Sequence, residues 1–491
     1  MLKLAQFQVF LRLPLLSTPR RAVTITTRAP GQLFWGVTMS LRGWEGLLRA
    51  GAALGLLVIA SAQANAGGLG VREQSVYGQG SSFAGVAAGG ALSSMYWNPA
   101  TMTQFPGIVS ETGVSGIFPF ASHTPTSGIL SGPPFNFLGT SNVAEAAPVA
   151  SGYTSLQFAP NLWFGLSINS PFGLAENFPD SWAGRFYGSG NELLRTFNAA
   201  PSIAWQINNW ISIGAGVQIQ YAKATFEAGL PVGPPFGLPG NLGGVGSQAT
   251  LRGTGWGFGA TAGVTLTPTP TTTIGLGWRS ALNQKIHGEL VTSTIAPGTT
   301  IGSVQATVDL PDIVSLGIRQ RLDPQWTLLG TVEWSNWSRI GTSNVLQLNG
   351  APATILGNPF SLKFQWRDSW YFSGGAEYAW TDRLTVRGGV GYEISPITDQ
   401  VRTAIIPGND RVLASVGGSW IAFKGLHFDV AYTHVWQKDT SINLVPGNPS
   451  AIPGLPYTGT ANVHFDLLSV ALVVRFDEIE PTARRPFLKY Q

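Results

Sequence analysis

The chain of 491 residues contains no cysteine, few charged residues and no long apolar run. Without cysteine it forms no disulfide and has no lipid-anchored N-terminal cysteine. Charged residues make up 11% of the sequence, against roughly a quarter in soluble domains. The absence of an 18-residue apolar run argues against a helical membrane protein. Low charge combined with 17 Trp residues instead favours a transmembrane β-barrel, in which apolar residues occupy alternate strand positions.

The N-terminal part has the features of an export signal. Basic residues precede the apolar stretch 50–62, and Ala64-Asn65-Ala66 places small residues at the two positions that a signal peptidase reads. The apolar stretch is short for a helix that spans a bilayer. We therefore predict a cleaved secretory signal at 39–66, preceded by an upstream extension at 1–38.

Removal of this segment changes the charge balance. Residues 1–66 contain seven Lys or Arg and one Glu, so 22 basic and 24 acidic residues remain. The predicted mature chain therefore has a net charge of about −2, and it contains no basic run of the kind that binds nucleic acid. A nucleic-acid partner is not expected.

Period-two alternation is strong in three eleven-residue stretches, 211–221, 384–394 and 426–436. In each stretch one face is apolar and aromatic, while the other is small, polar or charged, as in a strand between lipid and a wet or plugged lumen. Eleven residues suffice for a tilted strand to cross a bilayer, whereas strands of soluble sandwiches are mostly about five or six residues long. Trp and Tyr recur near the ends of these stretches, where an amphipathic ring suits the headgroup level.

Short turns alternate with long, Pro- and Gly-rich loops along the chain. The short turns are expected near 160–161, 208–209, 268–270, 323–324, 381–382 and 424–425, and the long loops near 119–148, 171–194, 226–250, 291–303, 338–361, 395–409 and 438–460. Short periplasmic turns and long outer loops are the pattern of outer-membrane barrels. We predict an all-β fold, a 14-stranded antiparallel transmembrane β-barrel over residues 107–476, with a polar tail at 477–491.

Residues 67–106, between the signal and the first long strand, are rich in small residues and alternate poorly. They are unsuited to a lipid-facing strand, and a segment of this length on the periplasmic side has room inside the lumen. We predict that they form an N-terminal hatch that plugs the barrel. Near the end of this segment, Pro99 has no N–H group and disfavours a helical conformation at Asn98.

The hatch residues carry a family resemblance. The spacing of Gly78, Gly80 and Phe83-Ala84-Gly85, followed by Asn98-Pro99-Ala100, resembles the N-terminal hatch of the FadL family of hydrophobic-compound transporters. The resemblance continues in the blocks 166–187, 198–222, 310–338 and 387–420 and covers residues 67–476. It implies a monomeric, plugged 14-stranded barrel that passes long-chain fatty acids or aromatic hydrocarbons across the bacterial outer membrane without ATP.

The resemblance also implies where gating and exit occur. Asn98, Pro99 and Ala100 are expected to hold the hatch conformation that opens a lumen pocket. An inward kink in the third strand is expected at Ser170, Pro171, Phe172 and Gly173, where Pro and Gly weaken ladder pairing, and it would create a lateral opening toward the lipid. An ordinary strand end entering a loop accounts for Pro171 equally well.

Two further sets of residues are candidates for binding cargo. The apolar loop residues Leu230, Phe236, Leu238 and Leu242 would capture a hydrophobic molecule outside the barrel, since exposed apolar loops are a liability without a ligand; alternatively, they pack on one another. The lumen-facing residues Glu377, Arg387, Glu393 and Asp429 would orient a carboxylate head group or anchor the hatch; alternatively, they pair among themselves.

The expected partners are a hydrophobic small molecule (fatty acid, hydrocarbon or detergent), outer-membrane lipids and the barrel assembly machinery. The last strand ends on Phe476, which resembles the assembly signal of such barrels. No cofactor, no metal ion and no enzymatic activity are expected, because none of the five His residues stands in a recognisable Ser/His arrangement. The alternative functions are a general diffusion porin and, less favoured, a barrel enzyme; a receptor role of the loops stays open.

Overall fold

The computed structural model describes residues 68–479, except residues 235, 237–240, 242–243, 294–298 and 356–357. The predicted signal, the upstream extension and all but the first residues of the polar tail lie outside these described residues. Among the residues described, no helix is both long and apolar enough to cross a membrane.

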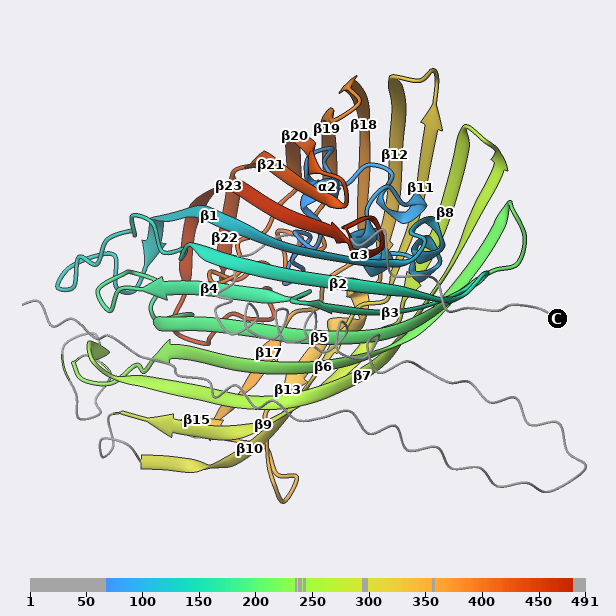
Figure 1. Cartoon of the computed structure of the whole chain (residues 1–491). Helices are drawn as coiled ribbons and strands as arrows, with labels where there is room; N and C mark the ends of the chain where they lie inside the picture. The colour runs from blue at the N-terminus through green and yellow to red at the C-terminus, as the bar shows by residue number, and fades with distance from the viewer. Residues whose placement is uncertain are drawn as a thin grey trace, which may run out of the picture. The chain divides into compact units, whose positions relative to one another are not determined.

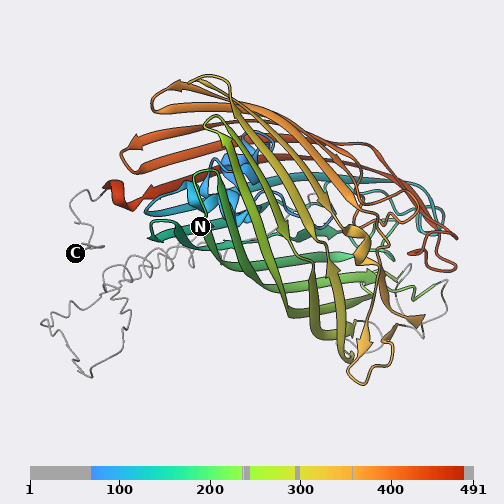
Figure 2. The same cartoon turned by 90° about the vertical axis from the view of Figure 1, so that its right-hand side faces the viewer.

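One antiparallel sheet closes on itself to form the barrel (Figures 1 and 2). The seam joins the first strand to the last, because β1 (Ile108–Gly128) pairs with β23 (Tyr457–Arg475) on one side and with β2 (Ala147–Ala159) on the other. Closure pairs the first strand with the last, so that among the described residues no barrel strand is left at a free outer edge of the sheet. The predicted 14-stranded antiparallel barrel is confirmed.

Several of the spans are divided into two consecutive segments. The spans between β2 and β23 are β3 (Leu162–Asn169) with β4 (Gly173–Phe178), β5 (Gly190–Gln206), β6 (Ile211–Gly229), β7 (Gln248–Thr269), β8 (Thr272–Arg279) with β9 (Leu282–Thr292), β10 (Thr299–Leu310) with β11 (Ile313–Arg321), β12 (Trp326–Ser335), β18 (Ser369–Thr381), β19 (Leu384–Ile394), β20 (Arg411–Phe423) and β21 (Leu426–Gln437) with β22 (Thr440–Leu444). The loop between β12 and β18 contains η6 (Trp337–Ile340), β13 (Thr342–Asn344), β14 (Leu346–Gln347), β15 (Thr354–Ile355), β16 (Asn358–Pro359) and β17 (Ser361–Lys363), and α3 (Phe476–Ile479) follows β23.

Each predicted short turn joins two adjacent strands; residues 160–161, for example, join β2 to β3. The long loops are shorter than predicted, because several strands continue past the clear alternation. The predicted loop 171–194 contains all of β4 and the start of β5. Leu193 and Leu194 are consecutive apolar residues on opposite faces of β5, and this hides the period of two at that position.

The two faces of the strands have the predicted orientation. On β6, Ile213, Val217 and Ile219 are exposed on the outer surface, whereas Gln218 and Gln220 are buried. Exposed Trp residues lie near both ends of the strands, with Trp205, Trp210, Trp326 and Trp380 toward the short turns and Trp256, Trp370 and Trp436 toward the long loops. These two belts match the two headgroup levels of a bilayer.

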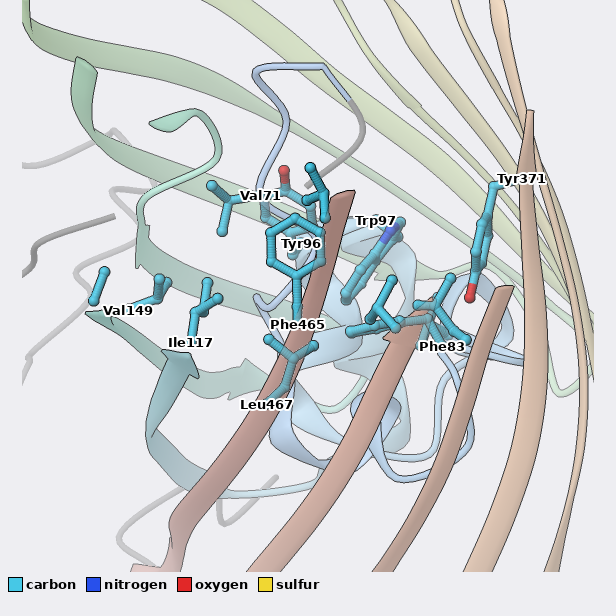
Figure 3. Packing of buried hydrophobic residues seen from close by; sticks show 14 of the residues in the cluster. Val71, Phe83, Tyr96, Trp97, Ile117, Val149, Tyr371, Phe465 and Leu467 are labelled. Atoms are coloured by element: carbon cyan, nitrogen blue, oxygen red, sulfur yellow. The ribbon is translucent and has the colours of Figure 1, made fainter. Parts of the chain in front are cut away.

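Residues 68–106 form short helices that pack inside the barrel. They are α2 (Val76–Gln79), η2 (Val86–Ala88), η3 (Leu92–Tyr96) and η4 (Pro99–Gln104), drawn in blue in Figures 1 and 2. These helices contact strands on several sides of the wall, including β5 to β8, β11, β20, β21 and β23. Phe83 and Trp97 of this segment belong to the same buried cluster as Tyr371 and Phe465 of the wall (Figure 3).

Glycines of the wall allow the hatch backbone to approach closely. A Cβ atom on Gly275 of β8 would lie 1.8 Å from the carbonyl oxygen of Ala87, and one on Gly389 of β19 would lie 2.2 Å from that of Ser81. Any side chain at these two positions would therefore overlap the hatch. Period-two alternation places both glycines on the lumen face, but only the structure reveals what they contact.

Candidate functional site: the strand break and the cavity beside it

The third strand is broken at the residues that the sequence predicts for the kink. β3 ends at Asn169 and β4 begins at Gly173, and Ser170, Pro171 and Phe172 leave the ladder. Asn169 pairs with Asn198 and Gly173 pairs with Arg195, so three residues of the third strand face two residues of β5. This one-residue excess is a β-bulge, which a proline without an N–H group favours.

The hatch pairs with the broken strand. The N–H of Val71 donates to the carbonyl of Pro171 (2.8 Å), and the N–H of Gly173 donates to the carbonyl of Leu69 (2.9 Å). The side chain of Gln74 donates to the carbonyl of Ser170 (2.9 Å). We call hatch residues 68–71 and the 170–173 segment, joined in this way, the hatch–strand bridge.

The ladder between the second and third strands is interrupted at the same level. β2 pairs with β3 as far as Gly152 and Ile168, and within the described residues β2 does not pair with β4. Contact resumes only beyond β2, where Ala144 bridges to Glu176. The hatch–strand bridge therefore lies where the wall lacks a continuous ladder.

A small cavity lies beside the hatch–strand bridge, and the space inside it that a water-sized sphere reaches is about 20 Å³, room for about one water molecule. It is lined by Gly68 of the hatch, by Pro119, Ala121, Ala144, Ala175 and Glu176, by Ile406, Pro407 and Gly408 of the loop after β19, and by Arg411, Gln437, Val463 and Phe465. Most of these residues are apolar, and the charged groups are Glu176 and Arg411.

Arg411 is buried, with 5% of its surface exposed. Its Nε donates to the side-chain oxygen of Gln437 (3.0 Å), and its guanidinium carbon lies 5.0 Å from the centre of the Phe465 ring. Among the described residues, the two Nη atoms of Arg411 have no hydrogen-bond or ion-pair partner. The Nη donors are therefore available to an anion in the cavity, and a planar guanidinium suits a carboxylate.

Glu176 and Glu192 are two buried carboxyl groups near the cavity, and neither has a cationic partner among the described residues. Glu176 lies directly opposite Glu192 in the β4–β5 pairing, and each has one buried carboxyl oxygen without a hydrogen-bond partner among the described residues. Glu73 of the hatch has such an oxygen as well, and burial raises the pKa of Glu73. Within the described part of the chain, no group of acidic or His residues is arranged to hold a metal ion.

Asn98, Pro99 and Ala100 lie elsewhere in the lumen, against β7. Asn98 is fully buried, and its Nδ2 donates to the carbonyls of Ala87 (2.8 Å) and Val264 (2.9 Å). Its Oδ1 accepts from the N–H of Ala100 (3.0 Å), which makes Asn98 the N-cap of η4 with Pro99 as the first helical residue. This stretch therefore ties two parts of the hatch to the wall and does not line the cavity.

The predicted lumen charges pair with one another and also hold the hatch. Arg387 lies 3.9 Å from Glu377 and 3.9 Å from Asp429, and its guanidinium carbon lies 3.7 Å from the centre of the Tyr77 ring of the hatch. The hydroxyl of Tyr77 donates to Glu377, and burial raises the pKa of Tyr77 to about 12. Both roles considered from the sequence, mutual pairing and hatch anchoring, are present in one network.

Arg72 of the hatch makes a second anchor. Its guanidinium lies 2.7 Å from Glu333 and 3.5 Å from the predicted lumen residue Glu393, and its carbon lies 3.8 Å above the Tyr371 ring. Buried ions are costly unless they are paired in this manner. The predicted lumen charges therefore lie at the hatch anchors and not in the cavity.

Of the four predicted capture residues, the structure describes Leu230 and Phe236, which lie in the loop between β6 and β7. Leu230 is buried and belongs to a small cluster with Val232 and Ala249, and Phe236 packs edge-on against Phe186 with ring centres 5.4 Å apart. Leu238 and Leu242 lie outside the described residues. Leu230 and Phe236 therefore pack against other loop residues, which is the alternative that the sequence left open.

Sequence reasoning did not single out Arg411, Gln437 or Glu176. The cavity is assembled from residues near positions 68, 144, 176, 411 and 463, and neither spacing nor periodicity connects such distant segments. The stretch 407–411, which ends on Arg411 at the start of a strand whose other inward residues are small or apolar, resembles a block of the family, but the residues alone did not indicate its role.

The profile of the outer membrane protein transport protein family (OMPP1/FadL/TodX) matches residues 57–476. The chain belongs to this family. Membership in the OMPP1/FadL/TodX family makes it an outer-membrane transport protein and not an enzyme. The family resemblance seen in the sequence is confirmed.

Relatives within the OMPP1/FadL/TodX family cover nearly the whole barrel. The chain is 27% identical over 423 residues to the long-chain fatty acid transport protein of Escherichia coli K12, covering 79% of this chain and 92% of that protein. It is 25% identical over 427 residues to outer membrane protein P1 of Haemophilus influenzae, covering 78% and 88%.

Solved structures of the family share the fold. A Pseudomonas aeruginosa FadL homologue superposes with a TM-score of 0.72 at 21% identity, covering 83% of this chain and 100% of that one. The Pseudomonas putida toluene transporter TodX superposes with a TM-score of 0.59 at 14% identity, covering 84% and 99%. At these identities the likeness concerns the barrel architecture.

Proposed function

We propose that the protein passively takes up hydrophobic molecules across the outer membrane, through the lumen cavity and sideways into the lipid beside the broken third strand. The observation that carries this proposal is the coincidence of three features: the cavity, the interrupted ladder and the hatch–strand bridge. Two relatives, a long-chain fatty acid transport protein and a toluene transporter, suggest the cargo classes.

A lateral route suits such cargo physically. Apolar surface gains nothing from an aqueous channel, but it gains free energy on moving between an apolar cavity and lipid. The N-terminal hatch residues and the 170–173 segment separate the cavity from the interrupted wall. Displacement of residues 68–71 breaks the few backbone hydrogen bonds of the hatch–strand bridge, each of which contributes about 1 kcal/mol, and it withdraws the buried side chains of Leu69 and Val71 from their clusters. The role of 67–106 as a gating hatch is part of this proposal, as is function as a monomer.

Arg411 favours a long-chain carboxylate as the cargo. Its unpaired Nη donors stand in an otherwise largely apolar cavity, and a fatty acid supplies a carboxylate for these donors, while its alkyl chain enters once displacement of residues 68–71 widens the cavity. An aromatic hydrocarbon is the second candidate, because it would contact the Phe465 ring and the apolar lining while leaving Arg411 without a partner.

A disulfide lock of the hatch–strand bridge tests the route. Gly70 and Phe172 form an antiparallel bridge, and the surrounding hydrogen bonds make them a non-hydrogen-bonded pair, whose Cα atoms lie about 4.5 Å apart and so within disulfide range. Because the chain has no cysteine, the double variant Gly70→Cys/Phe172→Cys has no competing thiol. We expect oxidation to abolish uptake of a labelled long-chain fatty acid by cells that lack other such transporters, and reduction to restore it.

The single variants Gly70→Cys and Phe172→Cys serve as matched controls, since each carries the side-chain change without the crosslink. Uptake that is equal in the oxidised and reduced double variant would refute the lateral route. A general diffusion porin is tested with the same material, because a porin predicts a large steady conductance whether or not the bridge is locked.

A further inference from the structure

The outer wall formed by β5, β6, β7 and β9 carries basic residues near the long-loop ends of these strands. Arg195, Lys223, Arg252 and Lys285, here called the basic patch, point outward, since each shares its strand face with lipid-exposed residues such as Trp205, Val217 and Trp256. Lys223, Arg252 and Lys285 are exposed, and Arg195 is half-buried.

The strand register brings these residues together. Arg195 stands directly opposite Lys223, and Lys223 stands directly opposite Thr254. Arg252 lies two positions from Thr254 on the same face, and Lys285 stands opposite Trp256. Side chains directly opposite one another have Cβ atoms about 5 Å apart, and diagonal neighbours about 7–8 Å. The patch therefore spans four adjacent strands and about two rows of side chains.

The patch lies at the level of the outer-leaflet headgroups. β6 begins at Ile211 after a short turn, and Tyr221 is ten residues further along the strand, the length that a tilted strand needs to cross the hydrocarbon core. The ring of Tyr221 packs against that of Trp256 with centres 5.1 Å apart, as in an aromatic belt. Lys223 follows two residues later on the same face.

Among the described residues, three of the four basic side chains of the patch lack an acidic partner, and the fourth has an exposed one. Arg252 pairs with Glu289 at 3.2 Å, and both side chains are well exposed, so the pair is weak. Nearby acids are engaged by polar groups: Glu227 accepts from the backbone N–H of Asn191, and Asp309 accepts from Asn283. Among the described residues, Arg195, Lys223 and Lys285 make no ion pair, and Nε of Arg195 is buried without a hydrogen-bond partner.

Arg195 and Lys223 are like charges placed directly across a strand pair, an arrangement that destabilises a sheet. An anion between the two cations would remove this repulsion, and the arrangement would then not destabilise the sheet. The rest of the rim is built differently, since Asp368, Asp410 and Asp466 accept hydrogen bonds there from Trp334, Tyr392 and Tyr432.

We propose that the basic patch binds a phosphate-bearing lipid of the outer leaflet, of the lipid A class. The phosphates would lie between Arg195, Lys223 and Lys285, and the acyl chains would run along the exposed apolar residues below the Tyr221–Trp256 pair, such as Ile219 and Phe258. Charge complementarity and depth in the membrane together select this occupant, because phosphates of such lipids lie immediately outside the hydrocarbon core. The proposal is independent of the transport route.

The test uses the purified full-length protein and a matched charge control. The patch variant combines Arg195→Gln, Lys223→Gln and Lys285→Gln. The control combines Arg321→Gln, Arg383→Gln and Lys424→Gln, which removes three exposed charges from the short-turn end of the barrel. Binding of diphosphorylated lipid A and of its dephosphorylated form is measured by native mass spectrometry, and heat-modifiable gel mobility verifies that each barrel is folded.

We expect the unaltered protein and the control to bind phosphorylated lipid A at least about tenfold more tightly than the dephosphorylated form, as charge-assisted hydrogen bonds to phosphate imply. The patch variant should lose this preference. Equal affinity for the two lipids, or a patch variant with unchanged preference, overturns the proposal. Two other results would also overturn the proposal: a fatty acid retained at the patch, or a dimer that the patch variant abolishes. Each would assign the surface to another occupant.

Discussion

On the side of β8 and β19 the hatch backbone rests directly on glycines of the wall, whereas on the side of the third strand it is joined to the wall by the hatch–strand bridge. The first contact is reinforced by the ion pairs of Arg72 with Glu333 and Glu393. The second consists of a few backbone hydrogen bonds beside a cavity. The contacts with β8 and β19 thus fix the hatch. The hatch–strand bridge is suited to open while the remainder of the hatch stays in place.

The largest effect is expected when both contacts are removed together. Deleting residues 68–105 leaves the lumen of the barrel without the segment that fills it, so we predict a steady ion conductance at least about tenfold above that of the intact protein and a loss of selective uptake. Planar-bilayer recordings measure the conductance, and uptake of a labelled fatty acid measures the selectivity. Selective uptake with unchanged conductance in the deletion variant would contradict the role of the hatch.

The substitution Gly275→Val disturbs the contact between the hatch and β8 and leaves the residues of the hatch–strand bridge unchanged. The new side chain would overlap the carbonyl of Ala87, so we predict that the free energy of unfolding falls by about 2 kcal/mol or more and that conductance rises. Gly374→Val is the matched control, because a Cβ atom at Gly374 meets nothing within 4 Å. Thermal unfolding measures the stability of both variants. Equal stabilities would show that the hatch does not rest on β8.

The substitution Arg411→Gln tests the side of the third strand, where the cavity lies. Loss of a charge-assisted hydrogen bond costs about 1.5–3 kcal/mol, so the affinity for a long-chain fatty acid should fall about 10- to 100-fold. The affinity for a fatty alcohol of the same length, which has no carboxylate, should change little. Fluorescent-ligand displacement measures both values, and a parallel loss for the two ligands would place the effect in the packing of Arg411 on Phe465.

The smallest expected effect concerns Glu73, which follows the hatch–strand bridge. Because burial raises the pKa of Glu73, the docked hatch favours the protonated carboxyl, and docking should weaken as the pH rises through that raised pKa. Arg72 and Arg411 oppose this shift, and Glu393 adds to it. We predict that hydrogen exchange of residues 68–74, corrected for its intrinsic pH dependence, becomes faster as the pH rises through the raised pKa of Glu73, and that Glu73→Gln removes this trend. An unchanged trend in Glu73→Gln would assign it to another group.

Period-two alternation was sufficient to predict the barrel, because each lipid-facing strand must alternate over its whole membrane span. The kink residues were predictable as well, since Pro171 and Gly173 both disfavour a regular ladder. β4 was missed, because it follows this break and five of its six residues are buried, so that its two faces do not alternate between apolar and polar surroundings. The cavity was not predictable, because Arg411, Glu176 and Gly68 meet only after the barrel has closed.

The glycines at positions 275 and 389 have a consequence for how the molecule unfolds. Glycine weakens a strand, since it loses more backbone entropy than other residues and offers no side chain for packing. Where these wall segments lack side chains, the backbone of Ala87 and Ser81 occupies the space instead. The hatch and the wall therefore share one interior, and we expect them to unfold in a single cooperative transition, with low-energy opening confined to the few residues that precede Arg72.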